Sequence, residues 1–178
     1  EGMKTVAYEI SEEFDWDPPE HLVVPVGGGA LLAGIHNGFR DLINLGFIER
    51  IPKLHAVQTQ SCNPVVKAFD KSWDRPRAVV PGPTIAEGAH ISNPERGGEI
   101  LEAIRHSDGV AVAVSERKIR EYHRKLAEKE GLFVEPTSIL PIAGLEKLND
   151  LGVFGSGERV LAPLTGSGLK DVEVLNES

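Results

Sequence analysis

The stretch Val24-Pro25-Val26-Gly27-Gly28-Gly29-Ala30 decides the fold class, because it joins a short apolar run to an amphipathic repeat. The apolar run, Leu22 to Val26, is typical of a buried strand. After the glycines, and as far as Gly46, apolar residues recur at helical spacing at Leu31, Ile35, Phe39 and Leu42. The stretch therefore predicts a strand, a glycine turn and a helix.

The same alternation of strands and helices continues along the 178 residues, of which 40% are hydrophobic. Further strands are predicted at Leu54 to Gln58, Gly109 to Val114 and, as a final buried strand, Arg159 to Leu164. Helices are predicted for Gly2 to Trp16 (broken by Pro18-Pro19), Pro64 to about Phe69, Pro94 to Arg105, between the N-cap Ser115 and Gly131, and from Pro136 to the connection beginning at Leu151. The stretch Asp74 to Pro83 is predicted as a loop. We expect one α/β domain with a mainly parallel sheet flanked by helices.

Composition narrows the classes of function. Asp and Glu outnumber Lys and Arg by 27 to 19, and the basic residues are scattered, so nucleic acid is not expected as a partner. No apolar run reaches the length of a membrane span, and a single cysteine cannot form an intramolecular disulfide, so we expect no membrane partner and a cytoplasmic location. Cys62 is interpreted as a buried thiol, with a pocket-lining role as the alternative. The six histidines lack metal-ligand spacing, so we expect surface or hydrogen-bonded core roles and no metal.

The glycine turn has a chemical consequence. Free backbone amides at the start of a helix, with the helix dipole behind them, favour an anion such as a phosphate. The spacing is neither G-x-G-x-x-G nor G-x-x-x-x-G-K-[ST], which disfavours a dinucleotide or nucleoside triphosphate and suits a small cofactor monophosphate. The alternative is a plain tight turn.

A second glycine-rich loop, Thr165-Gly166-Ser167-Gly168, follows the last predicted strand. Ligands of open parallel sheets collect at the carboxyl ends of the strands, so both loops are expected to face one pocket. The second loop would add a hydroxyl, from Thr165 or Ser167, aimed at a heteroatom. The alternative is a turn leading into a terminal strand, Val172 to Leu175.

Five segments, in order, resemble the later half of threonine synthase, and the resemblance runs over almost the whole chain. They are Glu1-Gly2-x-Lys4-Thr5-x-Ala7-Tyr8-Glu9, Val24-Pro25-Val26-Gly27-Gly28-Gly29, Ala111-Val112-Ala113-Val114-Ser115, Phe133-Val134-Glu135-Pro136-Thr137-Ser138 and Thr165-Gly166-Ser167-Gly168-Leu169-Lys170-Asp171.

The resemblance implies the large domain of the tryptophan-synthase-β-like, fold type II enzymes, which use pyridoxal 5'-phosphate. It implies that Gly27, Gly28, Gly29 and Ala30 bind the cofactor phosphate and that the Thr165 hydroxyl bonds the pyridine nitrogen. A hydroxyl there, rather than a carboxylate, would leave the ring largely unprotonated. The activity implied for the full-length enzyme, a pyridoxal-phosphate-dependent lyase, is conversion of O-phosphohomoserine to threonine plus phosphate, usually by a dimer acting on an amino-acid substrate.

Some segments depart from the synthase pattern. Gly-Gly-Gly-Ala differs from the Gly-Asn-Gly-Gly-Asn loop common in threonine synthases and is closer to threonine dehydratases, as is Thr84-Ile85-Ala86-Glu87-Gly88. The ending Thr165 to Asp171 favours the synthase. A threonine or serine dehydratase or ammonia-lyase is therefore the alternative enzyme. Glu135 lies near the cofactor by resemblance, or else satisfies amides of a helix turn, and Glu87 is a loop carboxylate or, in the dehydratase-like case, a site residue.

The largest departure is an absence. The S-x-K-x-R-type segment that carries the Schiff-base lysine in this superfamily has no counterpart here, and Lys4 and Lys170 match family positions that are not that lysine. The opening Glu1-Gly2-Met3 indicates a cut end. We therefore expect residues 1–178 to be a C-terminal cofactor-binding portion, without the N-terminal portion that holds the small domain, without catalytic residues, and inactive by itself. A non-catalytic cofactor-binding domain is the remaining alternative.

Overall fold

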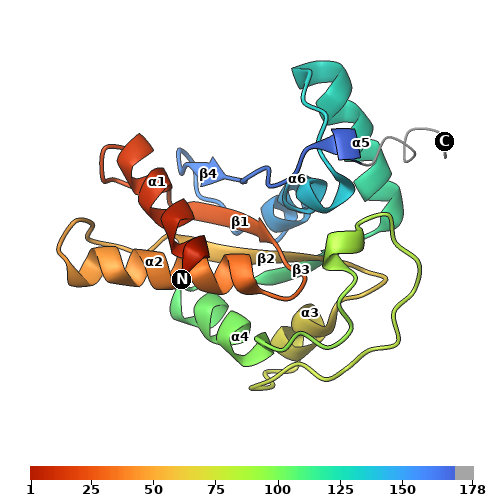
Figure 1. Cartoon of the computed structure of the whole chain (residues 1–178), viewed down its shortest axis with the longest axis horizontal. Coiled ribbons are helices and arrows are strands. Elements are labelled where there is room, and N and C mark those ends of the chain that lie inside the picture. Colours follow the sequence, from red (N-terminus) through yellow and green to blue (C-terminus); the bar gives the residue numbers. More distant parts are fainter. Residues whose placement is uncertain (171–178) are drawn as a thin grey trace.

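The computed structural model describes residues 1–170, so the predicted terminal strand Val172 to Leu175 lies outside the described residues. Helices and strands alternate along this part of the chain, as predicted (Figure 1). The elements are η1 (Gly2–Lys4), α1 (Thr5–Glu13), β1 (His21–Pro25), α2 (Ala30–Asn44), β2 (Lys53–Thr59), α3 (Pro64–Asp70), η2 (Glu87–Ala89), α4 (Gly97–His106), β3 (Ala111–Val114), α5 (Glu116–Glu130), α6 (Pro136–Asp150), β4 (Val160–Leu161) and η3 (Gly168–Lys170).

The four strands form one parallel sheet in the order β3-β2-β1-β4. Leu22 of β1 pairs with Leu54 of β2 on one side and with Leu161 of β4 on the other. Figure 1 shows α1 to α4 and the pair α5 and α6 on opposite sides of this sheet. The predicted fold class, a parallel sheet flanked by helices, is confirmed.

The strands β1, β2 and β3 each contribute to two hydrophobic cores, because successive side chains on a strand point to opposite faces of the sheet. Leu22 and Val24 belong to the core under α1 to α4, whereas Val23 between them belongs to the core under α6. Ala111 and Ala113 of β3 alternate with Val112 and Val114 in the same way. Burial on both faces explains why the strands read as continuous apolar runs in the sequence.

The strand order reverses at β1. The chain passes from β1 to β2 and then β3 on one side, and it returns to pair β4 with the opposite edge of β1. Such a reversal opens a crevice at the carboxyl ends of the two strands. The glycine turn leaves β1 there, and the loop beginning at Thr165 follows β4 at the same end of the sheet.

Two sequence predictions need correction. The final strand spans only Val160 and Leu161 and is not buried, since Val160 is 38% exposed. Within the described residues β4 pairs only with β1, and Pro163 has no amide hydrogen with which to extend the ladder. Prolines 18 and 19 do not break the first helix either: α1 ends earlier, at Glu13, and is followed by left-handed backbone at Asp15 and Trp16.

Candidate functional site

The three glycines of the first loop have different reasons to lack a side chain. A Cβ atom on Gly27 would collide with the carbonyl oxygen of Gly88. Gly29 has a φ of 89°, which disfavours other residues, and a Cβ atom there would collide with the Ile100 side chain. Gly28 is exposed, and a Cβ atom on it would meet nothing within 4 Å. Packing therefore explains two of the glycines and leaves open space over the third.

The start of α2 offers backbone donors beside that space. Gly29 is the N-cap, no side chain caps this helix end, and the first helical bond runs from the Ala33 amide to the Gly29 carbonyl at 3.0 Å. Amides of the first turn have no acceptor within the helix, and they carry the positive end of its dipole. Ala30 is exposed at this end. The residues present can accommodate a monophosphate group, because backbone donors and the open space over Gly28 lie at the same helix end.

The second loop is pinned to the segment that leads into α6. The Glu135 amide donates to the Gly166 carbonyl at 3.0 Å, and the Gly168 amide donates to the Phe133 carbonyl at 3.1 Å. A Cβ atom on Gly168 would stand 2.7 Å from the Phe133 ring, so this glycine permits the close approach. The loop therefore has a defined position relative to α6.

The two hydroxyls predicted for this loop have different surroundings. The Ser167 hydroxyl accepts a hydrogen bond from the Leu169 amide at 3.3 Å, within its own loop. The Thr165 hydroxyl lies 3.0 Å from the hydroxyl of Ser138, a buried residue in the first turn of α6. Thr165 itself is exposed at the carboxyl end of the sheet. Ser167 is exposed as well, and Thr165 is the one whose hydroxyl contacts a residue outside its own loop.

A third loop, Thr84 to Ala89, joins the two glycine-rich loops. Its Gly88 carbonyl packs against Gly27, and its Gly88 amide donates to the Thr137 hydroxyl at 3.0 Å. Thr137 and Ser138 are adjacent, so one turn of α6 contacts the third loop with the first residue and the Thr165 loop with the second. Sequence reasoning missed both hydroxyls. Pro136 could have indicated them, because a proline at the start of a helix places the next two residues in the first turn.

Glu135 and Glu87 occupy different places around these loops. Glu135 is the N-cap of α6 but makes no capping hydrogen bond, so the expectation that it satisfies amides of the helix turn is wrong. Its carboxylate instead lies against Gly166, where a Cβ atom would collide with it. Glu87 is exposed in η2, beside the residue that packs on Gly27.

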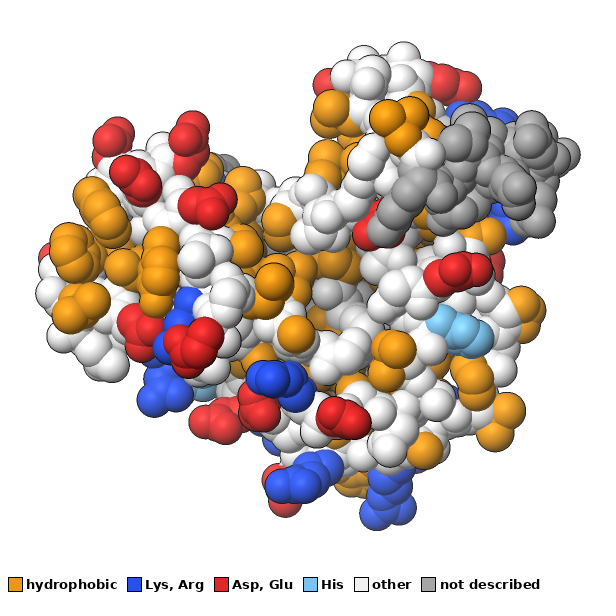
Figure 2. Space-filling model, in the orientation of Figure 1, with side chains coloured by type: hydrophobic (Ala, Val, Ile, Leu, Met, Phe, Trp, Pro, Cys, Tyr) orange, Lys and Arg blue, Asp and Glu red, His pale blue; other side chains and the backbone are white. Residues whose placement is uncertain are grey.

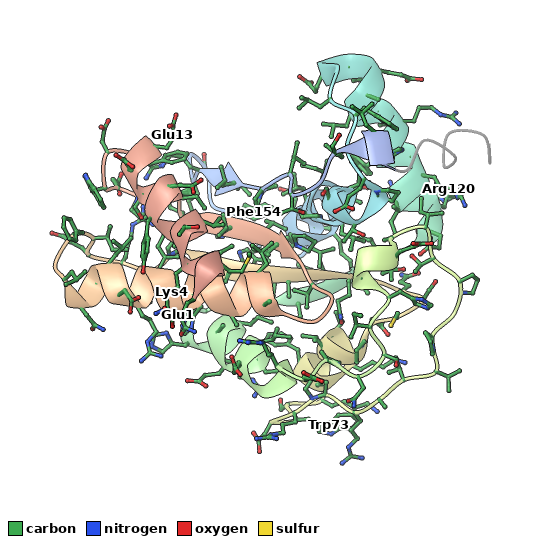
Figure 3. All side chains as sticks on the ribbon, in the orientation of Figure 1. Glu1, Lys4, Glu13, Trp73, Arg120 and Phe154 are labelled. Carbon is green, nitrogen blue, oxygen red and sulfur yellow. The ribbon has the colours of Figure 1, made fainter. Side chains whose placement is uncertain are left out.

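Three of the buried histidines and the cysteine have structural surroundings in the protein interior. His21 and His55 are buried and share a hydrogen bond of 2.9 Å, and Phe154, labelled in Figure 3, packs edge-on against the His21 ring. His123 is also buried, 2.7 Å from the Val134 carbonyl. Cys62 is a buried free thiol whose pKa is raised by burial. Hydrogen-bonded core roles are confirmed for these three histidines, and a buried position for Cys62.

Lys4 lies beside α2 and is held there by ion pairs. Its Nζ lies 2.9 Å from an Asp41 carboxylate oxygen and 3.1 Å from a Glu1 carboxylate oxygen (Figure 3). The hydrogen bond to Asp41 is the main cause that raises the pKa of Lys4. A lysine that forms a Schiff base is activated by the opposite shift, so Lys4 has the wrong surroundings for that role.

Among residues 1–170, no three or more His, Cys, Asp or Glu side chains are grouped so that they could hold a metal ion. Over the same residues, every helix is too short or too polar to cross a membrane.

The chain is similar to known proteins over most of its length. A family model described as "Pyridoxal-phosphate dependent enzyme" matches residues 1–166. The threonine synthase of Methanocaldococcus jannaschii is 40% identical over 174 residues, which is 96% of this chain and 42% of that protein. The threonine synthase of Methanosarcina acetivorans is 36% identical over 98% of this chain and 43% of its own length. The chain therefore spans less than half the length of these curated relatives.

The fold has close counterparts among solved structures. A fungal L-serine ammonia-lyase from Rhizomucor miehei superimposes with a TM-score of 0.76 over 99% of this chain and 55% of that one. Its sequence identity is 21%, so the likeness concerns the fold alone.

Proposed function

The chain belongs to the family of pyridoxal-phosphate dependent enzymes, and we propose that it is the C-terminal, cofactor-binding portion of a threonine synthase. The whole enzyme, a lyase in this proposal, converts O-phosphohomoserine and water to threonine and phosphate. The proposal is supported by the 40% and 36% identity to two threonine synthases over nearly the whole chain. An amino-acid substrate is in keeping with the family.

In this proposal, the residues predicted from the sequence hold the cofactor. The amides of Gly27, Gly28, Gly29 and Ala30 bind the phosphate, and the Thr165 hydroxyl bonds the pyridine nitrogen. When bound, the pyridoxal ring supplies an electron sink for charge that develops on the amino acid. The chain's own contribution is to bind and orient that ring, with the phosphate at the start of α2 and the nitrogen at the end of β4.

The observation that carries the proposal is the open space over Gly28. This glycine stands between Gly27 and Gly29, whose lack of a side chain has structural causes, whereas neither a contact nor a left-handed φ demands glycine at position 28. Close approach of a ligand to the backbone accounts for it. Because free amides lie at the same helix end, the ligand that fits this space is one with a negatively charged group.

Binding of pyridoxine 5'-phosphate, which carries the phosphate and ring but no aldehyde, tests this cradle by calorimetry. Gly28→Ala should raise the Kd at least tenfold and leave the free energy of unfolding almost unchanged, because the added methyl group fills only ligand space. Gly2→Ala is the matched control, since Gly2 is also exposed with nothing within 4 Å of a Cβ atom. Equal affinity of the wild-type chain and Gly28→Ala would contradict the proposal.

The alternative enzyme is a dehydratase or ammonia-lyase of the same fold. The Gly-Gly-Gly-Ala loop and the structural likeness to a serine ammonia-lyase favour it, whereas the identity to threonine synthases favours the main proposal. Assays of a protein that carries this chain with its upstream region separate the two. Phosphate release from O-phosphohomoserine supports a synthase, and ketoacid formation from threonine or serine supports a dehydratase.

We also propose that the Schiff-base lysine and the small domain belong to an upstream portion, so that residues 1–178 alone bind cofactor but catalyse no reaction. Borohydride reduction of the chain with pyridoxal phosphate tests this point. Scattered, substoichiometric labelling is expected, and specific labelling of one lysine would contradict it. If the chain binds the cofactor but no upstream coding region supplies the lysine segment, a non-catalytic binding domain is favoured instead.

A dimer in the cytoplasm completes the proposal. Figure 2 shows hydrophobic side chains gathered over α1 and α2. Trp16, which follows α1, and Phe47, which follows α2, stack with ring centroids 4.8 Å apart while remaining 41% and 52% exposed. Exposed apolar surface of this kind favours association with another protein surface. The free thiol of Cys62 suits a reducing compartment. Light scattering of the purified chain tests the association.

A further inference from the structure

Ser138 lies at the centre of a small hydrogen-bond network at the carboxyl end of the sheet. Its side chain is fully buried in the first turn of α6. The Ser138 Oγ atom lies 3.2 Å from the Thr165 amide nitrogen, 2.9 Å from the Gly166 amide nitrogen and 3.0 Å from Thr165 Oγ1. One hydroxyl therefore contacts two backbone groups and one side chain of the second loop.

The direction of these hydrogen bonds follows from a count of hydrogens and lone pairs. A serine hydroxyl has one hydrogen and two lone pairs. The amides of Thr165 and Gly166 can only donate, so they occupy both lone pairs of Ser138 Oγ. The Ser138 hydrogen then goes to the remaining contact, Thr165 Oγ1, which acts as the acceptor.

The same count leaves the hydrogen of the Thr165 hydroxyl directed away from Ser138. Thr165 is exposed, and its hydroxyl makes no other hydrogen bond among residues 1–170. It therefore presents a donor to whatever lies at the carboxyl end between β1 and β4. Any atom with a free lone pair can accept that hydrogen bond, a water molecule in the free chain or a ligand atom that replaces it.

We propose that Ser138 is a positioning residue that fixes the Thr165 hydroxyl as a hydrogen-bond donor to the pyridine nitrogen of the cofactor, and so keeps that nitrogen unprotonated. The inference rests on the proposed cofactor function for the identity of the acceptor. The direction of the Ser138 to Thr165 bond does not depend on it. A merely structural Ser138 would pin the loop without controlling protonation of the ring.

The bond direction is tested without any ligand, by neutron diffraction from crystals of the deuterated chain. A deuterium on Ser138 Oγ that points to Thr165 Oγ1 supports the proposal. A deuterium on Thr165 that points to Ser138 overturns it. This measurement is decisive even if the proposed cofactor function fails.

The consequence for the ring is tested by nitrogen NMR with pyridoxine 5'-phosphate labelled with ¹⁵N in the ring. Bound to the wild-type chain, the nitrogen should give the shift of an unprotonated pyridine. In Ser138→Ala and in Thr165→Val the shift should move to that of a pyridinium, with Kd raised at least tenfold in each. The double variant should bind no more weakly than Thr165→Val, because both changes remove one interaction.

Two control variants and one fallback variant accompany this test. Thr165→Ser keeps the hydroxyl and should keep the unprotonated nitrogen. Ser107→Ala removes another buried serine, which accepts a hydrogen bond from the Leu54 amide at 3.0 Å in the other core, and should leave the shift unchanged. If Ser138→Ala does not fold, Thr165→Val, which alters an exposed side chain, still reports the ring protonation.

The outcomes separate the two proposals. A pyridinium shift in the wild-type chain would overturn the role of Ser138, and so would a double variant whose loss of binding free energy is the sum of the two single losses. Neither result would affect the proposal that Gly27 to Ala30 bind the phosphate. Absence of any binding by the wild-type chain contradicts the cofactor function and removes the ring nitrogen as the acceptor, and the neutron measurement then decides the Ser138 bond on its own.

Discussion

Gly27 packs against the carbonyl oxygen of Gly88 so closely that no side chain fits between them. This contact joins the strand exit after β1 to the loop that contains Thr84 to Ala89. The neighbouring residue, Gly28, makes no such contact. Adjacent glycines in one loop therefore carry different constraints, one from folding and one from the space left for a ligand.

Gly27→Ala should destabilise the chain by about 1–3 kcal/mol, because the backbone of either loop must shift to admit the methyl group. Gly28→Ala should change the free energy of unfolding by less than about 0.5 kcal/mol, since the methyl group enters open space. Urea denaturation of the two variants measures the difference. Equal destabilisation would mean that the contact with Gly88 has no energetic weight.

The buried histidine pair has a defined order of hydrogens. His55 Nδ1 accepts from the Val110 amide at 3.2 Å, so its hydrogen is on Nε2 and is donated to His21 Nδ1 at 2.9 Å. The His21 hydrogen is then on Nε2 and is donated to Glu158 Oε2 at 2.7 Å. A proton added to His55 Nδ1 would break the hydrogen bond from the Val110 amide, because that nitrogen could no longer accept.

The free energy of unfolding should therefore fall in acid. Burial lowers the pKa of His55 from 6.5 to about 3, so this stabilisation is complete above pH 6.5 and is lost as the pH falls towards 3. Burial also lowers the pKa of His36 to about 4. Each histidine should contribute a slope approaching about 1.4 kcal/mol per pH unit. Denaturation at several pH values measures this slope, which His55→Gln should reduce. An unchanged slope in this variant would contradict the role of His55.

Glu20 holds the start of β4 beside β1. Its carboxylate accepts from the Arg159 amide at 2.7 Å and from the Arg50 guanidinium at 2.8 Å. The hydrogen bond from the Arg159 side chain is the main cause that lowers the pKa of Glu20 to about 2. The stabilisation is therefore present above pH 4.5 and is lost as the pH falls towards 2.

Glu20→Gln should lower the free energy of unfolding at pH 7 by about 1.5–3 kcal/mol, the range for hydrogen bonds to charged groups. Glu13→Gln, at the exposed end of α1, is the matched control and should have almost no effect (Figure 3). The difference between the two variants should shrink at pH 3 in urea denaturation. A difference that does not depend on pH would show that the charge of Glu20 is unimportant.

Glu116 anchors the third loop from α5. One carboxylate oxygen accepts from the Thr59 hydroxyl at 2.5 Å, and the other accepts from the Ile85 amide at 3.0 Å. In Glu116→Ala both acceptors are removed, so both hydrogen bonds are lost. Hydrogen exchange at the Ile85 amide should become at least tenfold faster. The exposed Glu128→Ala, on the same helix, should leave it unchanged.

Most helix and strand positions were predictable because their signals are local. Ser115 caps α5 by accepting a hydrogen bond from the Lys118 amide, and Gly131 ends that helix with a φ of 68°, both as the residue types predict. The last strand was not predictable from its apolar residues. Its exposure depends on which strand lies beside it, and that is a property of the assembled sheet.

The sequence by itself determined the parallel α/β fold and the two glycine-rich loops, because strand burial, helix periodicity and glycine turns depend on neighbours along the chain. Only the tertiary structure decided which glycine is open and which is packed, since Gly27 meets Gly88 from a distant loop. It also decided the part played by Ser138, whose partner Thr165 is 27 positions away. The donors and acceptors around a hydroxyl determine whether it donates or accepts a given hydrogen bond. Around Ser138 those groups come together only when the sheet and α6 have formed.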